Sequence, residues 1–230
     1  MDFHLFEASI GLEFKNKDLL KQAFIHRSYL NENKTLKLEH NERLEFLGDA
    51  VLELAVTVYL YEKYPGKAEG DLTAYRSALV NSNTLATAAE AMGVNSFLLL
   101  SKGEAKDTGR ARQYILANTF ESVVGAIYLD QGYEAASKFI SAQLFHLTDD
   151  IVANRKFIDS KSHFQEAAQE KTGVTPSYKI IKEVGPDHNK VFTVGVYLKD
   201  DLVVTGEGKS KQEAEQDAAQ KAIELKKWVD

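Results

Sequence analysis

The chain has 230 residues, a net charge of −6 and a sequence pI of about 5.6; 44% of its residues are hydrophobic and 27% are charged. This is the composition of an ordinary globular protein, and it argues against a disordered, fibrous or low-complexity chain. Cysteine is absent, which excludes disulfides, thiolate metal sites and cysteine nucleophiles. The chain starts without the basic and apolar regions of a signal peptide, and no apolar run reaches the ~18 residues that span a bilayer. We therefore expect a cytoplasmic protein without membrane association.

Hydrophobic periodicity predicts that the first part of the chain is helical. No convincing pattern of alternating hydrophobicity, which would indicate a strand, appears there. The helical patterns cover residues 41–61, 71–92, 114–129 and 133–147.

After residue 150 the pattern changes to a short helix, three strands rich in Val and Ile, and a closing helix. These elements are predicted at residues 160–170, 178–184, 191–198, 202–206 and 210–227. We expect an all-α domain in residues 1–150, a polar linker in residues 151–159, and a small α+β domain of order α-β-β-β-α in residues 160–230.

Acidic side chains share one face of the helix expected at residues 41–60. At ~100° per residue, Glu42, Glu45, Asp49 and Glu53 fall within an arc of about 80°. The solvated face of an amphipathic helix would give the same pattern. Apolar flanks and the lack of basic partners on this face favour a cleft instead. Carboxylates that repel one another need a cation, and all-oxygen ligands favour Mg²⁺ or Mn²⁺.

A second helix supplies candidates for the other wall of such a cleft. Asn118 and Glu121 are three residues apart and share a face. Gly125 continues this face by one turn and would let another helix approach closely. Taken alone, the two polar residues would be read as ordinary exposed side chains.

Residues 41–52, Asn-Glu-Arg-Leu-Glu-Phe-Leu-Gly-Asp-Ala-Val-Leu, closely resemble the signature segment of the ribonuclease III family. Other segments agree with this family in the expected order, at residues 26–29, 69–72, 103–104, 109–110 and 115–121. Residues 160–227 resemble a double-stranded RNA-binding domain, so the resemblance covers nearly the whole chain. It implies that residues 1–150 form the catalytic and dimerisation domain.

The resemblance implies a Mg²⁺-dependent endoribonuclease, with Mn²⁺ as a substitute and no organic cofactor. Members of the family act as homodimers, cut both strands of double-stranded RNA, and leave 5′-phosphates, 3′-hydroxyls and short 3′ overhangs. Processing of ribosomal and messenger RNA precursors is the corresponding expectation for this chain.

The resemblance also assigns roles residue by residue. Glu45, Asp49 and Glu121 match metal-binding carboxylates, and the last two stand at the positions usually called catalytic. Glu42 and Glu69 match accessory acidic positions near the cleft.

Asn118 departs from the family pattern, because bacterial members commonly have Asp at this position. An Asn side chain can still coordinate a metal through its carbonyl oxygen, but it removes one negative charge. We expect Asn118 to be a metal ligand and metal binding to be weaker. The alternative is a catalytically weakened or inactive protein that only binds double-stranded RNA.

The chemistry expected of this site is attack on a phosphodiester by a water that the carboxylate-held Mg²⁺ activates. The sequence contains no Ser/His/Asp pattern that would indicate a covalent route. His26 could serve as a base, but its apolar neighbours favour a structural role.

Three segments of the C-terminal part are candidate contacts to duplex RNA, which proteins recognise mainly by shape. Lys209, Ser210 and Lys211 begin the last helix, whose Ser-x-x-Glu capping box leaves free N–H groups for a phosphate. His188 lies in a turn-rich loop, and Gln165 lies on the first helix of this part. A plain helix cap, a turn and an exposed helix face are the alternatives at these three places.

Overall fold

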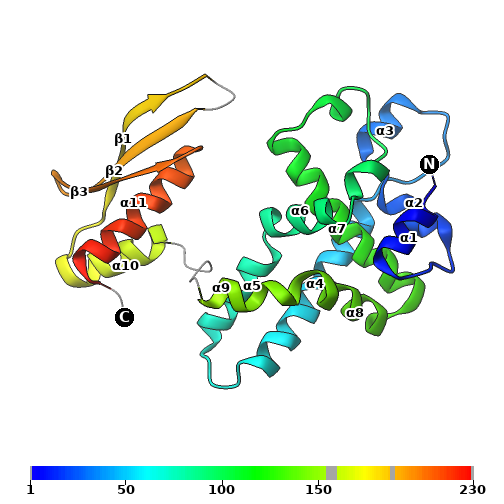
Figure 1. Cartoon of the computed structure of the whole chain (residues 1–230), viewed down its shortest axis with the longest axis horizontal. Coiled ribbons are helices and arrows are strands. Elements are labelled where there is room, and N and C mark those ends of the chain that lie inside the picture. Colours follow the sequence, from blue (N-terminus) through cyan, green and yellow to red (C-terminus); the bar gives the residue numbers. More distant parts are fainter. Residues whose placement is uncertain (1, 154–159, 187–189, 229–230) are drawn as a thin grey trace. The chain divides into compact units, whose positions relative to one another are not determined.

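A computed structural model of the chain describes residues 2–153, 160–186 and 190–228. The chain forms two compact units, Met1–Phe157 and Ile158–Asp230 (Figure 1). The first unit is helical and the second combines a three-stranded sheet with two helices, which confirms the predicted fold class. Within the described ranges, no helix is both long enough and apolar enough to cross a membrane.

The N-terminal unit is built from α-helices joined by short loops and 3₁₀ turns. In chain order these elements are α1 (His4–Ile10), α2 (Lys17–Ala23), α3 (Arg27–Glu32), α4 (Glu42–Lys63), α5 (Glu69–Val80), α6 (Ser82–Ala91), η1 (Val94–Phe97), η2 (Glu104–Lys106), α7 (Arg110–Gln131), α8 (Tyr133–Leu144), η3 (Phe145–Leu147) and α9 (Thr148–Ala153).

The two longest helices, α4 and α7, cross backbone to backbone at a pair of glycines. A Cβ atom on Gly48 would lie 1.8 Å from the carbonyl oxygen of Glu121, and one on Gly125 would lie 2.2 Å from the carbonyl oxygen of Leu44. Real Cβ atoms do not tolerate such distances, so only glycine permits this crossing. The close approach that Gly125 predicts therefore exists, and its partner is α4.

The helical pattern at residues 71–92 proves to be two helices, α5 and α6. Asn81 separates them because its backbone is extended, with φ −70° and ψ 157°. Its side chain accepts a hydrogen bond of 2.9 Å from the Thr84 N–H and thereby caps α6.

The linker expected at residues 151–159 does not begin where the sequence suggests. Residues 151–153 belong to α9, and Ile151 is buried. Asp149 lies in the first turn of this helix, where an acidic residue is favourable, and accepts a bond of 2.6 Å from Lys63 at the end of α4. Residues 154–159 lie outside the described ranges.

The C-terminal unit is an antiparallel sheet of order β1-β2-β3 with α10 and α11 packed on it (Figure 1). Its elements are α10 (Ser160–Thr172), β1 (Ser177–Val184), β2 (Val191–Leu198), β3 (Asp201–Gly208) and α11 (Lys211–Lys226).

Small residues let α11 lie close to this sheet. Val194 and Val196 of β2 are buried, and Phe164 of α10 completes the core. A Cβ on Gly206 of β3 would lie 2.1 Å from the backbone nitrogen of Ala218. Val194 and Val196 are two residues apart and therefore lie on one face of β2.

Candidate active site

Four polar side chains from α4 and α7 flank the glycine crossing. Glu45 and Asp49 come from α4, and Asn118 and Glu121 come from α7; we call these four residues the carboxylate cluster. Gly48 lies between the two acids of α4 and contacts the backbone of Glu121. The crossing therefore brings together residues that are about 70 positions apart in the sequence.

The charges of the cluster act strongly on one another. Burial, together with the charges of Asp49 and Glu45, raises the pKa of Glu121 to about 8. Burial also raises the pKa of Glu45, with further contributions from Glu42 and Asp49. The neighbouring Asn118 amide partly offsets that increase in the pKa of Glu45. Without a cation, Glu121 is therefore mostly protonated at neutral pH.

The donor set of the cluster fits a hard divalent cation. It offers three carboxylates and one amide oxygen, and its carboxylates repel one another. Among the described residues, no three His, Asp or Glu side chains are already arranged around a common metal position.

Arginines from other helices pair with the two ends of the acidic stripe of α4, which consists of Glu42, Glu45, Asp49 and Glu53. At one end Glu42 lies 3.3 Å from Arg27 of α3, and at the other end Glu53 lies 3.9 Å from Arg76 of α5. Sequence periodicity within α4 could not reveal these partners. Only the middle of the stripe joins the carboxylate cluster.

Glu69 lies in different surroundings. It is the first residue of α5, is exposed, and accepts a hydrogen bond of 3.1 Å from Thr73. It also lines a pocket of about 410 Å³ between α4 and α5, together with Tyr61 and Arg76. Glu69 therefore lies among the residues of this pocket and not among those of the carboxylate cluster.

His26 has a structural function in α3. It is the N-cap residue, its Nδ1 lies 2.8 Å from Ser28 Oγ, and burial lowers its pKa. The Ser28 hydroxyl in turn accepts a bond of 3.0 Å from the Ser101 N–H. His26 therefore ties α3 to the segment that precedes α7.

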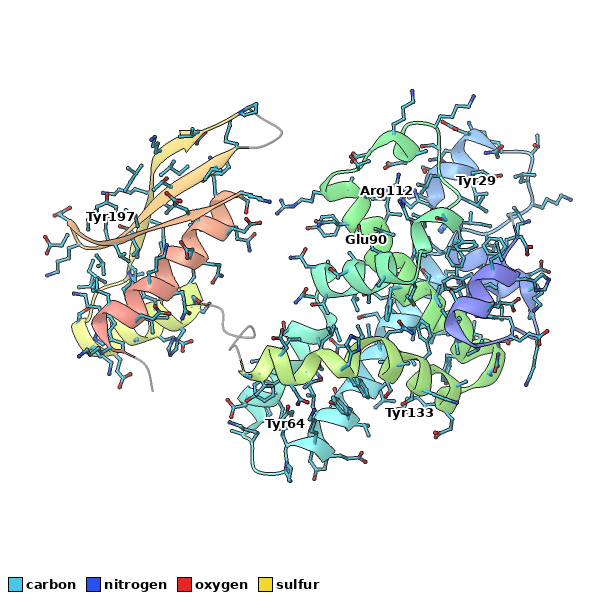
Figure 2. All side chains as sticks on the ribbon, in the orientation of Figure 1. Tyr29, Tyr64, Glu90, Arg112, Tyr133 and Tyr197 are labelled. Carbon is cyan, nitrogen blue, oxygen red and sulfur yellow. The ribbon has the colours of Figure 1, made fainter. Side chains whose placement is uncertain are left out.

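Arg112 fixes the loop that leads into α7 (Figure 2). Its guanidinium donates to the carbonyl oxygens of Glu104, at 2.7 Å, and Asp107, at 3.1 Å. Because these bonds fold the loop back on the first turn of α7, they help to set where the helix begins.

In the C-terminal unit, the predicted RNA contacts at α11 surround a capped helix start. Ser210 Oγ accepts a bond of 3.1 Å from the Glu213 N–H, and the Glu213 carboxylate accepts one of 2.9 Å from the Lys209 N–H. Lys209 and Lys211 are exposed, and Lys211 Nζ lies 5.9 Å from the centre of the Phe192 ring.

The other two predicted RNA contacts differ in what the structure describes. Gln165 is exposed on α10. His188 lies outside the described residues.

The structure also reveals an apolar surface on α4. Phe46, Leu54, Val58 and Tyr61 of α4 are 81, 53, 42 and 72% exposed. At ~100° per residue they lie within an arc of about 120° that adjoins the acidic stripe. We call these four residues the apolar stripe. Helical periodicity marks such positions as buried, but it does not distinguish a core from a contact with another chain.

Comparison with known proteins agrees with this architecture. The Ribonuclease-III-like family matches residues 16–147, and the double-stranded RNA binding motif matches residues 160–226. "Ribonuclease 3" of Bacillus licheniformis is 46% identical over 221 residues, which are 96% of this chain and 88% of that protein. "Ribonuclease 3" of Enterococcus faecalis is 46% identical over 213 residues, which are 93% of this chain and 92% of that protein.

A solved structure of the ribonuclease III nuclease domain from Campylobacter jejuni, described for its flexibility in a region involved in dimer formation, has the same helical fold. Its TM-score is 0.56 at 39% identity, and the match covers 62% of this chain and 98% of that domain. The two family matches, the similarity to curated relatives over almost their whole length, and the shared nuclease fold lead to one conclusion: the chain belongs to the ribonuclease III family.

Proposed function

We propose that this ribonuclease III family member, an endoribonuclease of double-stranded RNA, cuts its substrate at the carboxylate cluster with the help of a divalent cation. The observation that carries this proposal is the convergence of Glu45 and Asp49 with Glu121 at the α4–α7 crossing. The charges of Asp49 and Glu45 contribute to the raised pKa of Glu121, and carboxylates that repel one another in this way favour a bound cation over solvent.

All four residues of the cluster would hold the cation, Asn118 through its carbonyl oxygen. A Mg²⁺ ion, or Mn²⁺ in its place, lowers the pKa of a water and offsets negative charge on a phosphate. Asp49 and Glu121 lie on opposite helices and would position the attacking water against the phosphorus atom. Attack breaks the bond from phosphorus to O3′, so the products are a 5′-phosphate and a 3′-hydroxyl.

We further propose that two copies of the chain cooperate through the apolar stripe. Four large exposed hydrophobic side chains on one helix face form the kind of patch that mediates protein contacts. A two-fold arrangement would give one cluster to each strand of the duplex. Cuts that are offset between the two strands then leave short 3′ overhangs. The expected substrates are structured precursors of ribosomal and messenger RNA.

Duplex RNA would be held by the C-terminal unit, which matches the double-stranded RNA binding motif. The N–H groups at the start of α11 and the exposed Lys209 and Lys211 suit a phosphate. Gln165, which is exposed on α10, would contact the minor groove, where 2′-hydroxyls are displayed.

A cleavage assay tests the proposed reaction. The protein should cut a long RNA duplex with Mg²⁺ or Mn²⁺ but not with EDTA, and should leave single-stranded RNA and duplex DNA intact. Glu121→Ala should lower the rate by at least about 100-fold because a group that positions the reaction is lost. Glu90→Ala, which changes an exposed carboxylate of α6, is the control (Figure 2).

Two results would contradict the proposal. Duplex binding without cleavage by the wild-type protein would support the alternative of an inactive RNA-binding protein. A Glu121→Ala variant that cuts at the wild-type rate would show that the reaction does not take place at the carboxylate cluster.

A further inference from the structure

A group of contacts fastens α9, the last described element of the N-terminal unit, to the end of α4. Lys63, the last residue of α4, donates a hydrogen bond of 2.6 Å to Asp149 and one of 3.0 Å to the hydroxyl of Tyr59. The Tyr59 ring stacks on Phe145, with 3.7 Å between the ring centres and an angle of 10° between the planes. We call Tyr59, Lys63, Phe145 and Asp149 the α9 clasp.

The α9 clasp is more than a surface ion pair, which alone would contribute little to stability. Asp149 is largely exposed. The Lys63 ammonium, however, also lies over two aromatic rings, 5.4 Å from the centre of Tyr59 and 5.7 Å from that of Tyr64. Its hydrogen bonds to Asp149 and Tyr59 raise the pKa of Lys63, which is therefore charged at neutral pH. Burial of Ile151 holds α9 in addition.

The α9 clasp lies where the chain leaves the N-terminal unit. The helix α4 carries Glu45 and Asp49 of the carboxylate cluster, and Lys63 follows Asp49 by 14 residues, which is about 21 Å along the helix axis. Six residues, 154–159, join α9 to α10, the first element of the C-terminal unit. If α9 came off α4, residues 148–159 would join the two units, and the connection would be twelve residues long.

We propose that the α9 clasp, with Lys63 as a positioning residue, keeps the connection between the two units short and thereby strengthens the binding of duplex RNA. A short connection holds a second binding module at a high effective concentration, which falls roughly as the −3/2 power of the length of the connection. Doubling this length therefore lowers the effective concentration about threefold. The inference rests on the proposed binding of duplex RNA by the C-terminal unit.

The test measures kcat and KM for cleavage of one RNA duplex, together with hydrogen exchange of the α9 amides. Lys63→Glu places a carboxylate beside Asp149, so α9 should be released and its amides should exchange at least about tenfold faster. KM should rise about threefold while kcat stays at the wild-type value, because the carboxylate cluster is unchanged. Exchanging the two charges, by combining Lys63→Glu with Asp149→Lys, should restore both the slow exchange and KM.

A longer connection should reproduce the effect on KM without disturbing the α9 clasp. Insertion of six Gly and Ser residues between residues 156 and 157 should raise KM about threefold, while the α9 amides exchange as in the wild type. If Lys63→Glu does not fold, Asp149→Ala provides the same test, because it removes the partner of Lys63 at a largely exposed position.

Two substitutions in the N-terminal unit are controls. Lys138→Glu makes the same change of charge at an exposed position of α8 and should behave like the wild type. Lys17→Met removes a hydrogen bond of 2.6 Å from α2 to Glu7. It should lower the melting temperature without changing KM, which separates a loss of stability from a loss of the α9 clasp.

The inference is overturned if Lys63→Glu leaves α9 protected from exchange, because the clasp then does not hold this helix. Release of α9 with a lower kcat and an unchanged KM overturns it as well, since a merely structural role would give that result. An insertion that has no effect on KM, when Lys211→Glu raises KM, overturns this inference alone. If neither variant changes KM, the proposed RNA binding by the C-terminal unit is contradicted, and the inference with it.

Discussion

Glu121 links the electrostatics of the site to the stability of the fold. Its pKa is about 8 in the folded protein, above its ordinary value of 4.5. A carboxyl group with a raised pKa binds more protons in the folded state than in the unfolded state. Its stabilising contribution is therefore complete below pH 4.5 and is lost as the pH rises toward 8.

In EDTA, the melting temperature of the wild type should fall between about pH 5 and pH 8 because Glu121 is forced to ionise next to Asp49 and Glu45. Glu121→Gln cannot ionise, so at pH 8 it should melt several degrees higher than the wild type, while at pH 5 the two should agree. Glu90→Gln, at an exposed position, should follow the wild type. Identical pH profiles of the wild type and Glu121→Gln would contradict the raised pKa.

Lys211 should contribute to duplex affinity without contributing to the fold. It is exposed beside the start of α11, and Lys211→Glu would place a negative charge near an RNA phosphate. We expect duplex affinity to fall about tenfold and the salt dependence of binding to decrease by about one phosphate contact, measured by gel shift. Lys226→Glu changes the far end of the same helix and should bind like the wild type. Unchanged affinity of Lys211→Glu would exclude this contact.

The α4–α7 crossing depends on the absence of side chains at its centre. Gly125→Ala would push a methyl group onto the Leu44 carbonyl oxygen, and a backbone atom cannot rotate away as a side chain can. We expect a loss of about 3 kcal/mol in the free energy of unfolding, measured with urea, together with loss of cleavage. Gly66→Ala, where the added methyl group meets open space, should be nearly neutral. An equal free energy of unfolding for Gly125→Ala and the wild type would show that α4 and α7 can move apart without destabilising the fold.

Much of this crossing is predictable because each helix has its own periodicity. The spacing of Glu45 and Asp49, the shared face of Asn118 and Glu121, and the missing side chain of Gly125 are all local properties. The pairing of Glu42 with Arg27 is not, because its partner comes from α3. The periodicity of one helix gives no information about charged side chains that another helix places beside it.

Two further features could not be predicted, for physical reasons. The six-residue helix α9 is too short to show a hydrophobic period, and it is held by its bond to Lys63 and the burial of Ile151. The exposure of Leu54 and Phe46 could not be predicted because apolar side chains that contact another chain follow the same helical pattern as apolar side chains of a core.

The apolar stripe leads to a prediction about the assembled molecule. Leu54 is exposed near the middle of α4, so Leu54→Glu should leave the folded chain intact but place like charges and unpaired carboxylates in a symmetric contact. Sedimentation should show two chains for the wild type and one for the variant. Cutting of both strands at one site should fall by at least about tenfold, because a lone chain brings a single carboxylate cluster to the duplex.

Leu225→Glu is the matched control for this experiment. Leu225 is a similarly exposed leucine on α11 of the C-terminal unit, outside the apolar stripe. This variant should sediment and cut like the wild type, whereas general effects of an added charge would appear in both variants. A Leu54→Glu protein that still sediments as two chains would show that the apolar stripe is not part of the interface. A wild type that sediments as one chain would contradict the dimer itself.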